Sequence, residues 1–297
     1  MSCYHPLVGF RSRLLSSNGR RPIVFNPSEG YSDLRVEIPC GQCIGCRLER
    51  SRQWAIRCVH EASLYEDNCF LTLTFDDDNL NRFGSLVKSD FQKFMKRLRK
   101  AHSDVKIRYF HCGEYGSRYG RPHHHACIFN FDFDDKILWS SQKIKLYRSP
   151  ELERLWPYGH ALIGDVTWES AAYVARYVLK KITGEKADEF YGWRLPPYVT
   201  MSRRPGIGAP WLKKFHADVY PDDSIVVRGN VTCRPAKFYD DMFDKIDEET
   251  FKEVKRKRCA AARKNMESIS RLKVKEECAN ARLKQKRRKY EENNVFD

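Results

Sequence analysis

The sequence predicts an α+β fold, in which an antiparallel sheet is flanked by helices. Segments with a period of two alternate with segments of helical period through the middle of the chain, and short loops join some of the strands. Of the 297 residues, 41% are hydrophobic, which is enough for a substantial core and argues against wholesale disorder. We expect a cysteine-rich segment with a helix over residues 1–66, a core over residues 67–235, and a basic tail over residues 236–297 that is helical or partly disordered.

The periodicity predicts three helices and three strands. The helices are expected over residues 47–66, 89–102 and 169–182, and the strands over residues 69–75, 105–112 and 123–131. In the first strand, Leu71 and Leu73 point to one face and Thr72 and Thr74 to the other. Ser89 and Gln92 would form a capping box at the start of the second helix. For the third helix, Thr167 is a candidate N-cap.

The chain is strongly basic, with a formal net charge of +15. From residue 252 to residue 297 there are 16 Lys and Arg against 7 Asp and Glu. Such an excess favours a polyanionic partner, and nucleic acid fits better than a membrane because no run approaches about 18 consecutive apolar residues. The start of the chain lacks the pattern of a secretion signal. We therefore expect an intracellular protein whose eleven cysteines stay reduced or bind metal.

Three cysteines stand at Cys-x2-Cys-x2-Cys spacing in "PCGQCIGCR", namely Cys40, Cys43 and Cys46. Three thiolates this close together can hold one metal ion. An iron–sulfur cluster would need a fourth cysteine shortly afterwards, which is absent, so structural Zn²⁺ is the more economical interpretation. Cys3 or His5 would supply the fourth ligand. The alternative is that these are merely small buried residues.

Three histidines in a row open the last predicted strand, "HHHACIFNF". Because side chains alternate along a strand, His123 and His125 share one face and His124 points away. Glu114, at the end of the neighbouring strand, could add a carboxylate oxygen. Two imidazoles, one carboxylate and open positions suit Mn²⁺ or Mg²⁺. The competing interpretation is a set of satisfied core histidines.

The third helix carries two tyrosines four residues apart, Tyr173 and Tyr177, which lie on one helix face. Arg176 and Lys180 flank the same region. A nearby cation favours the phenolate of a tyrosine, so these side chains are candidate nucleophiles for attack on phosphorus. Half-buried packing of an amphipathic helix explains the same pattern.

These motifs resemble those of a known family. "RPHHHACIF" is similar to the His-hydrophobic-His motif of HUH endonucleases, "YVARYVLKK" to their two-tyrosine motif with Tyr-x-x-Lys spacing, and "FLTLTFDD" to their first motif. More narrowly, "PCGQCIGCRLERSRQWAIR", "GEYG", "SAAYVARYV" and "MSRRPGIG" together resemble replication initiators of small single-stranded DNA phages, the gokushovirus branch of the Microviridae. The likeness covers residues 1 to about 215. The tail beyond about residue 236 matches no motif, and His124 occupies the middle slot that is usually hydrophobic, where we expect it to weaken strand burial slightly.

The resemblance implies a ferredoxin-like or RRM-like antiparallel core and a metal-dependent endonuclease that starts rolling-circle replication. Glu114, His123 and His125 would hold Mg²⁺ or Mn²⁺ on the scissile phosphate. One tyrosine would attack, leaving a 5′-phosphotyrosine and a free 3′-OH that primes a host polymerase. The other would cut the regenerated origin after one round, and strand transfer would close the displaced circle without ATP. The implied partners are viral origin DNA, single- and double-stranded, and the host replication helicase and polymerase, in the host bacterial cytoplasm.

Further candidates are expected to contact DNA. They are Thr72 and Thr74 on the first strand, Arg176 and Lys181 around the third helix, and Arg203 and Arg204 in "MSRRPGIG". The basic tail would bind phosphates without sequence preference, so that affinity falls with salt. Ordinary solvent exposure is the competing interpretation for all of them.

Two other functions remain open. A non-catalytic, zinc-containing nucleic-acid-binding protein would explain the charge and the cysteines, but would leave the histidine and tyrosine pairs as coincidence. A relaxase or transposase would use the same active site on another DNA.

Overall fold

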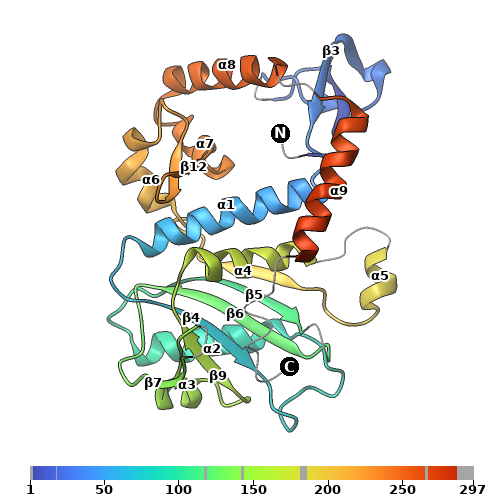
Figure 1. Ribbon diagram of the computed structural model, residues 1–297. Coiled ribbons are helices and arrows are strands. Elements are labelled where there is room, and N and C mark those ends of the chain that lie inside the picture. Colours follow the sequence, from blue (N-terminus) through green and yellow to red (C-terminus); the bar gives the residue numbers. More distant parts are fainter. Residues whose placement is uncertain are drawn as a thin grey trace. The chain divides into compact units, whose positions relative to one another are not determined.

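A computed structural model describes residues 3–17, 19–116, 119–141, 144–180, 186–264 and 267–285, without the side chains of 176–180, 186, 228, 284 and 285. The predicted α+β class is confirmed (Figure 1). By its internal contacts the chain forms two compact units, one of residues 1–50 with 258–287 and one centred on residues 51–257. The sequence instead predicts a division into residues 1–66, 67–235 and 236–297. Division by contacts does not test these boundaries, which stay a prediction.

The first unit contains a small antiparallel sheet in the order β2-β1-β3 and the C-terminal helix α9. Its elements are β1 (Leu7–Ser12), β2 (Ile23–Val24), the 3-10 helix η1 (Pro27–Glu29), β3 (Gly30–Ile38) and α9 (Ile269–Gln285). It also includes the beginning of α1 (Ile44–Ala62) and the end of α8 (Glu248–Lys264).

The second unit is built on a seven-stranded antiparallel sheet in the order β10-β5-β6-β4-β9-β8-β7. Its strands are β4 (Asn68–Thr74), β5 (Arg108–Tyr115), β6 (Pro122–Phe129), β7 (Ile137–Ser140), β8 (Leu146–Arg148), β9 (Ala161–Gly164) and β10 (Tyr198–Met201). The helices are α2 (Lys88–Ala101), α3 (Pro150–Leu155), α4 (Trp168–Lys180), α5 (Lys186–Tyr191), α6 (Ala209–Phe215), η2 (His216–Asp218) and α7 (Lys237–Phe243). A separate hairpin pairs β11 (Ile225–Arg228) with β12 (Val231–Cys233).

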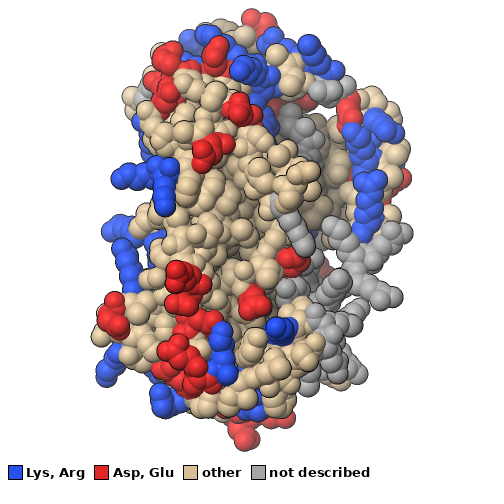
Figure 2. Space-filling view, turned by 60° about the vertical axis from the view of Figure 1, so that its left-hand side comes forward, with Lys and Arg blue, Asp and Glu red and all other residues tan. Residues whose placement is uncertain are grey.

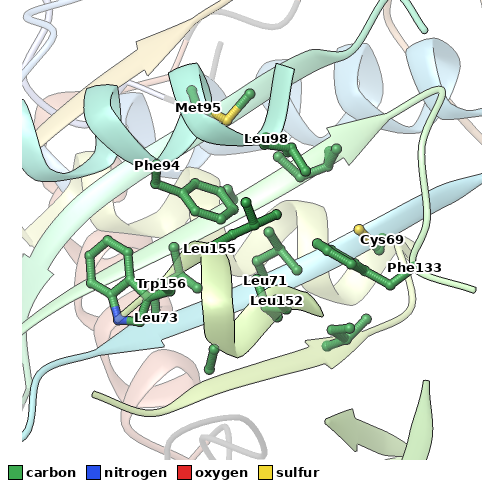
Figure 3. Close-up of a cluster of buried hydrophobic side chains, with 14 of the residues drawn as sticks. Cys69, Leu71, Leu73, Phe94, Met95, Leu98, Phe133, Leu152, Leu155 and Trp156 are labelled. Atoms are coloured by element: carbon green, nitrogen blue, oxygen red, sulfur yellow. The ribbon is translucent and has the colours of Figure 1, made fainter. Parts of the chain in front are cut away.

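One face of the large sheet is covered by α2 and α3. Figure 3 shows Phe94 and Leu98 of α2 pointing toward Leu71 and Leu73 of β4, as the period of two predicts. Trp156, at the end of α3, is fully buried and donates its indole N–H to the Thr74 carbonyl oxygen at 2.8 Å. Apolar burial on this side anchors β4, the strand next to β6.

The other face of the sheet is covered by α1 and α4. A buried ion pair joins α1 to the sheet, because Arg108 on β5 donates to the Glu61 carboxylate. The backbone N–H of Gly208 donates to the same carboxylate at 2.6 Å, and Arg108 also donates to the Pro205 carbonyl at 2.9 Å. Since both charged groups have several partners here, the pair is tolerated in a place where an isolated charge would not be.

The local signals at the helix starts have mixed outcomes. Thr167 caps α4 as predicted, because its hydroxyl accepts the N–H of Ser170 at 3.1 Å and the Ser170 hydroxyl accepts the N–H of Thr167 at 2.8 Å. The predicted capping box of Ser89 and Gln92 is wrong: the N-cap of α2 is Val87, two residues before Ser89, and it makes no side-chain cap hydrogen bond. The backbone of Val87 is extended, so the helical conformation begins at Lys88.

The first half of the predicted tail is a packed structure. Tyr239 and Phe243 of α7 and Phe251 and Val254 of α8 are buried in a third hydrophobic cluster. Beyond it, α9 is helical, as predicted, and residues 286–297 lie outside the described part of the chain. None of the described helices is long and apolar enough to cross a membrane.

Stability should fall in acid because of His60, which is buried in this third cluster against Trp211, with its Nδ1 3.1 Å from the Tyr239 hydroxyl. Burial lowers the pKa of His60 to about 4. The unfolded chain, with a histidine pKa of about 6.5, binds more protons between these values, so stability decreases as the pH falls from about 6.5 to 4. We expect His60 alone to account for a loss of about 2.5 kcal/mol between pH 7 and 4.5, measured by urea unfolding as the difference between the native chain and His60→Gln. His60→Gln should remove this share of the pH dependence, whereas His160→Gln, at an exposed histidine, should keep it.

Candidate active site and thiol cluster

The three histidines of β6 alternate between the two faces of the sheet as predicted. β6 lies between β4 and β5, and His123 is the direct partner of Glu114 on β5 and of Thr74 on β4. His125 pairs in the same way with Thr72. The side chains of His123, His125 and Glu114 therefore project from the α4 face of the sheet, and all three are buried.

His125 is held by contacts on both ring nitrogens. Its Nε2 lies 3.0 Å from Glu114 Oε1, and its Nδ1 lies 3.1 Å from the Thr72 hydroxyl. Its ring packs edge-on against Tyr173, with ring centroids 5.1 Å apart. A carboxylate, an imidazole and a phenol ring from three separate elements thus lie at one place.

Two imidazoles and a carboxylate are donor groups that bind divalent ions, but in this conformation not all of them are close together. His125 and Glu114 are in direct contact, whereas the rings of His123 and His125 lie 6.3 Å apart between centroids. Among the residues that the structure describes, the one group of three or more candidate ligands with donor atoms all within 4.8 Å is a cysteine cluster. Glu114 and His123 are nevertheless direct cross-strand partners, so their side chains leave the sheet next to each other on the same face. The Thr72 hydroxyl contacts Nδ1 of His125, and a contact of this kind orients the ring of a metal-binding histidine.

His124 belongs to a polar network on the opposite face. It is fully buried, and its Nδ1 lies 3.0 Å from Nε2 of His111, whose Nδ1 lies 2.8 Å from the Thr200 hydroxyl. The expectation that His124 weakens burial of the strand is wrong, because all eight residues of β6 are buried and the imidazole has a hydrogen-bond partner. His111 was missed in the sequence, although it stands at an inward-facing position of its predicted strand.

Of the two candidate tyrosines, Tyr173 faces the sheet. It is 5% exposed, and its ring also meets Phe70 edge-on at 6.3 Å. The side chains of Arg176, Tyr177 and Lys180 lie outside the described part of the structure, as does Lys181 entirely.

A surface pocket reaches both Tyr173 and His125. Its lining comes from β4, β6, β8, β9 and α4, from the residue two positions before β8, and from the residues between β9 and α4: Phe70, Thr72, His125, Ile144, Leu146, Leu162, Gly164, Asp165, Thr167 and Tyr173. The pocket provides an approach to the buried phenol from one side.

The other predicted DNA contacts have different surroundings. Thr72 is half-buried and lines the pocket, while Thr74 is buried and donates to the His160 carbonyl at 3.2 Å. Arg203 and Arg204 are exposed in the turn between β10 and α6. Of the described candidates, the arginines and Thr72 are thus accessible without rearrangement, and Thr74 is not.

The first unit brings together the four predicted cysteines, Cys3, Cys40, Cys43 and Cys46, with all sulfur atoms within 4.8 Å of one another. Cys43 and Cys3 are 4.0 Å apart between sulfurs. In a tetrahedral site with Zn–S bonds of about 2.3 Å, neighbouring sulfurs lie about 3.8 Å apart. His5, the alternative fourth ligand, instead contacts Glu276 of α9 at 2.6 Å.

Backbone N–H groups surround these thiols. Burial by itself would raise the pKa of Cys43, but hydrogen bonds from the N–H groups of Tyr4 and Cys46, at 3.4 and 3.5 Å, and from the Cys46 and Cys40 thiols outweigh it and lower that pKa to about 7. Burial raises the pKa of Cys3 and Cys46, so the cluster favours one thiolate at Cys43. Amides also donate to Cys3 and Cys40, each at 3.3 Å. A cluster that stabilises a thiolate in this way, at tetrahedral spacing, fits structural Zn²⁺.

The positive charge is distributed unevenly along the chain. Residues 1–50 and 258–287 carry 17 Lys and Arg against 7 Asp and Glu, a net charge of +10 in 80 residues. In this unit Tyr4 and the α9 residues Arg271, Lys275 and Arg282 line a pocket. Figure 2 shows basic and acidic side chains interspersed on one face of the molecule. The rest of the chain carries the remaining net charge of +5, the difference between +15 and +10, in 217 residues. The unit with the four thiols is therefore the more basic part of the chain.

The sheet site, with a tyrosine beside an imidazole and a carboxylate in a basic protein, defines a candidate phosphoryl-transfer site of a nucleic-acid-processing protein. Comparisons agree with a protein that acts in nucleic-acid replication. The family model named for the replication-associated protein ORF2 matches residues 68–182. The chain is 33% identical over 265 residues to the replication-associated protein VP4 of Bdellovibrio phage phiMH2K, covering 85% of this chain and 80% of that protein. It is 34% identical over 217 residues to the replication-associated protein ORF2 of Spiroplasma virus 4, covering 68% of this chain and 66% of that protein.

The chain thus belongs to the family of replication-associated proteins of small single-stranded DNA phages, the family that its motifs resemble. No solved structure matches it. The matched segment, residues 68–182, contains β4, β5, β6 and α4 and therefore every element of the sheet site.

Proposed function

We propose that this protein initiates rolling-circle replication by nicking one strand of a circular viral DNA through a phosphotyrosine and rejoining it later. One observation carries the proposal: the Tyr173 ring lies 5.1 Å from the ring of His125, which contacts Glu114 at 3.0 Å. Order β5-β6-β4-β9 within the sheet, with α2 between β4 and β5, supports the ferredoxin-like core of HUH endonucleases. We place this activity in the host bacterial cytoplasm, with the host helicase and polymerase extending the nicked strand.

In this proposal Glu114, His123 and His125 hold Mg²⁺ or Mn²⁺. Bound there, the ion would supply Lewis acidity toward a phosphate oxygen. The Thr72 hydroxyl forms a hydrogen bond with Nδ1 of His125. The other ring nitrogen, Nε2, lies toward Glu114 and would bind the ion. The buried surroundings exclude water from the phosphate, which favours transfer to tyrosine over hydrolysis.

Tyrosine is the proposed nucleophile. The phenol oxygen of Tyr173 or Tyr177 forms a bond to phosphorus as the bond to the 3′ oxygen breaks, and the proton lost by the phenol is balanced by the one gained at the 3′-OH. In the joining step a 3′-OH attacks the phosphotyrosine, so one phosphodiester replaces the other without ATP. Lys180 would stabilise the phenolate, while Arg176 and Lys181 would contact phosphates near it.

The first unit is proposed to bind DNA non-specifically. Zn²⁺ on the four cysteines would fix the N-terminal segment to the start of α1. Arg271, Lys275 and Arg282 lie on one helix at spacings of four and seven residues, or about 6 and 10 Å along its axis. Such a row can contact successive phosphates of a strand, and its contribution to affinity should decrease with salt.

The test is to mix the protein, Mn²⁺ and a single-stranded oligonucleotide from the viral origin, and to look for a covalent adduct on a denaturing gel. We expect an adduct that requires the metal, and a loss of at least about 10³-fold in its rate when Tyr173→Phe and Tyr177→Phe are combined. Tyr65→Phe, outside α4, is the matched control and should leave the rate unchanged.

Absence of an adduct with the native origin sequence, in a protein that still binds it, would favour a non-catalytic nucleic-acid-binding protein. An adduct that persists undiminished in the double variant would remove the tyrosines from the mechanism. Equal activity on unrelated hairpin ends would instead indicate a transposase or relaxase.

A further inference from the structure

The pocket beside His125 and Tyr173 has a composition that the nicking mechanism does not use. We propose that it binds the base of a nucleotide adjacent to the scissile phosphate, which makes it a specificity pocket for the nick site. The inference rests on the proposed function only in locating the phosphate at His125.

Position is the first argument. Thr72, His125 and Tyr173 line the pocket and also belong to the proposed active site. A nucleotide whose phosphate lies at His125 therefore has its base within reach of the pocket, since a base and its own phosphate are joined by one sugar. A phosphoryl-transfer enzyme that holds this base fixes which phosphate meets the nucleophile.

The walls of the pocket suit a flat, apolar ring. Phe70 and Tyr173 contribute aromatic rings, and Ile144, Leu146 and Leu162 contribute aliphatic surface. Proteins recognise unpaired bases by stacking them against aromatic and apolar side chains. Single-stranded DNA at an origin supplies such bases without the cost of opening a duplex.

Charge argues for a base and against a phosphate. Counting only described residues, Asp165 is the one side chain of the lining that carries a formal charge at neutral pH, apart from the titratable His125. A carboxylate repels a phosphate and accepts hydrogen bonds from amino groups. It therefore favours cytosine, adenine or guanine, which carry exocyclic amino groups, over thymine.

Gly164 allows the pocket to be filled without distorting the sheet. It is a buried residue of β9 that lines the pocket, and a Cβ added there would meet Leu146 at 3.6 Å and Phe70 at 3.9 Å, which are ordinary contacts. Gly164→Val adds enough volume to exclude a base, and Gly164→Ala is a smaller version that should fold at least as well as the native chain.

The experiment scans an origin oligonucleotide with 2-aminopurine, a fluorescent adenine analogue, placed singly at each position around the nick. Binding is measured without added Mn²⁺ or Mg²⁺ and without a chelator, so that no cleavage is needed and bound zinc is kept, with fluorescence anisotropy of an end label as a separate measure of affinity. We expect one position beside the nick to change emission strongly on binding. Gly164→Val should abolish that change, Gly164→Ala should reduce it, and other positions should respond as before.

A second readout uses the nicking reaction with Mn²⁺. An abasic site at the responsive position should reduce the rate of adduct formation about 10-fold in the native protein and have little further effect in Gly164→Val. Preference for an amino-bearing base at that position should be lost in Asp165→Asn and kept in Asp134→Asn, a matched change at an exposed carboxylate outside the pocket.

The two proposals fail separately. An adduct that forms normally, with no responsive position or with a response that survives in Gly164→Val, would overturn the base pocket and leave the nicking function intact. A responsive position that is lost in Gly164→Val, in a protein that forms no adduct, would support the pocket and refute the nicking function.

Discussion

Replacing Glu114 by Gln should reduce both metal binding and adduct formation by about 10²-fold or more, while single-stranded DNA binding is kept. The Glu114 carboxylate contacts His125 Nε2 at 3.0 Å and pairs across the sheet with His123. An amide of the same shape keeps the packing but removes the negative charge that would balance a divalent ion next to two imidazoles. Mn²⁺ affinity, measured by electron paramagnetic resonance or calorimetry, and the rate of adduct formation at saturating DNA would report the two effects.

Glu66→Gln is the control, since Glu66 is an exposed carboxylate outside the site. If Glu114→Gln forms the adduct at the native rate in limiting Mn²⁺, the carboxylate is not a metal ligand and the proposed site is incorrect. A lower melting temperature with unchanged Mn²⁺ affinity would give Glu114 a purely structural role.

Cys43→Ser should eliminate bound zinc from the purified protein and unfold the segment of residues 3–46 in the first unit. The Cys43 sulfur lies 4.0 Å from that of Cys3 and accepts N–H groups of Tyr4 and Cys46, so it is central to the cluster. The small sheet β2-β1-β3 buries few side chains, and in such a unit metal binding supplies much of the folding free energy. Zinc content by atomic emission should fall from one ion per chain to nearly none, and limited proteolysis should cut within this segment.

Cys259→Ser, at an exposed thiol of α8, should keep the zinc and the protease resistance. Retention of a full equivalent of zinc by Cys43→Ser would reject the four-cysteine site. Because the sheet site lies in the other unit, loss of zinc should leave adduct formation on short single strands largely unaffected and weaken mainly the binding of longer DNA.

Much of the sheet site was predictable because its signals are local and periodic. Alternation along a strand separates His124 from His123 and His125. Only a short loop joins the strand of Glu114 to the strand of the histidines, so a hairpin of these two strands is the simplest arrangement. The cysteines were predictable for a similar reason, since three of them follow one another at the beginning of a helix. Cys3, by contrast, lies 37 positions before Cys40, and the sequence alone did not decide between Cys3 and His5 as the fourth ligand.

Other features depend on register, which single positions do not reveal. The contact of His111 with His124 requires β5 and β6 to pair so that Cys112 faces His125, and no propensity encodes that offset. The pocket is assembled from β4, β6, β8, β9 and α4, so its lining as a whole does not form a motif, although His125 and Tyr173 each stand in one. At Ser89 the capping pattern was correct in composition, but the strand-like entry at Val87 decided where the helix begins.

β6 lies inside the sheet, with β4 hydrogen-bonded along one edge and β5 along the other. The backbone that carries the three imidazoles is consequently held by hydrogen bonds on both sides, and it cannot shift without breaking the pairing of β6 with β4 or β5. In the proposed mechanism, the movement that admits a DNA strand and presents each tyrosine in turn would therefore come from α4 and the segments next to it. If β6 stays in place while α4 moves, the same proposed metal ligands could serve cleavage at the start of a round of replication and joining at its end.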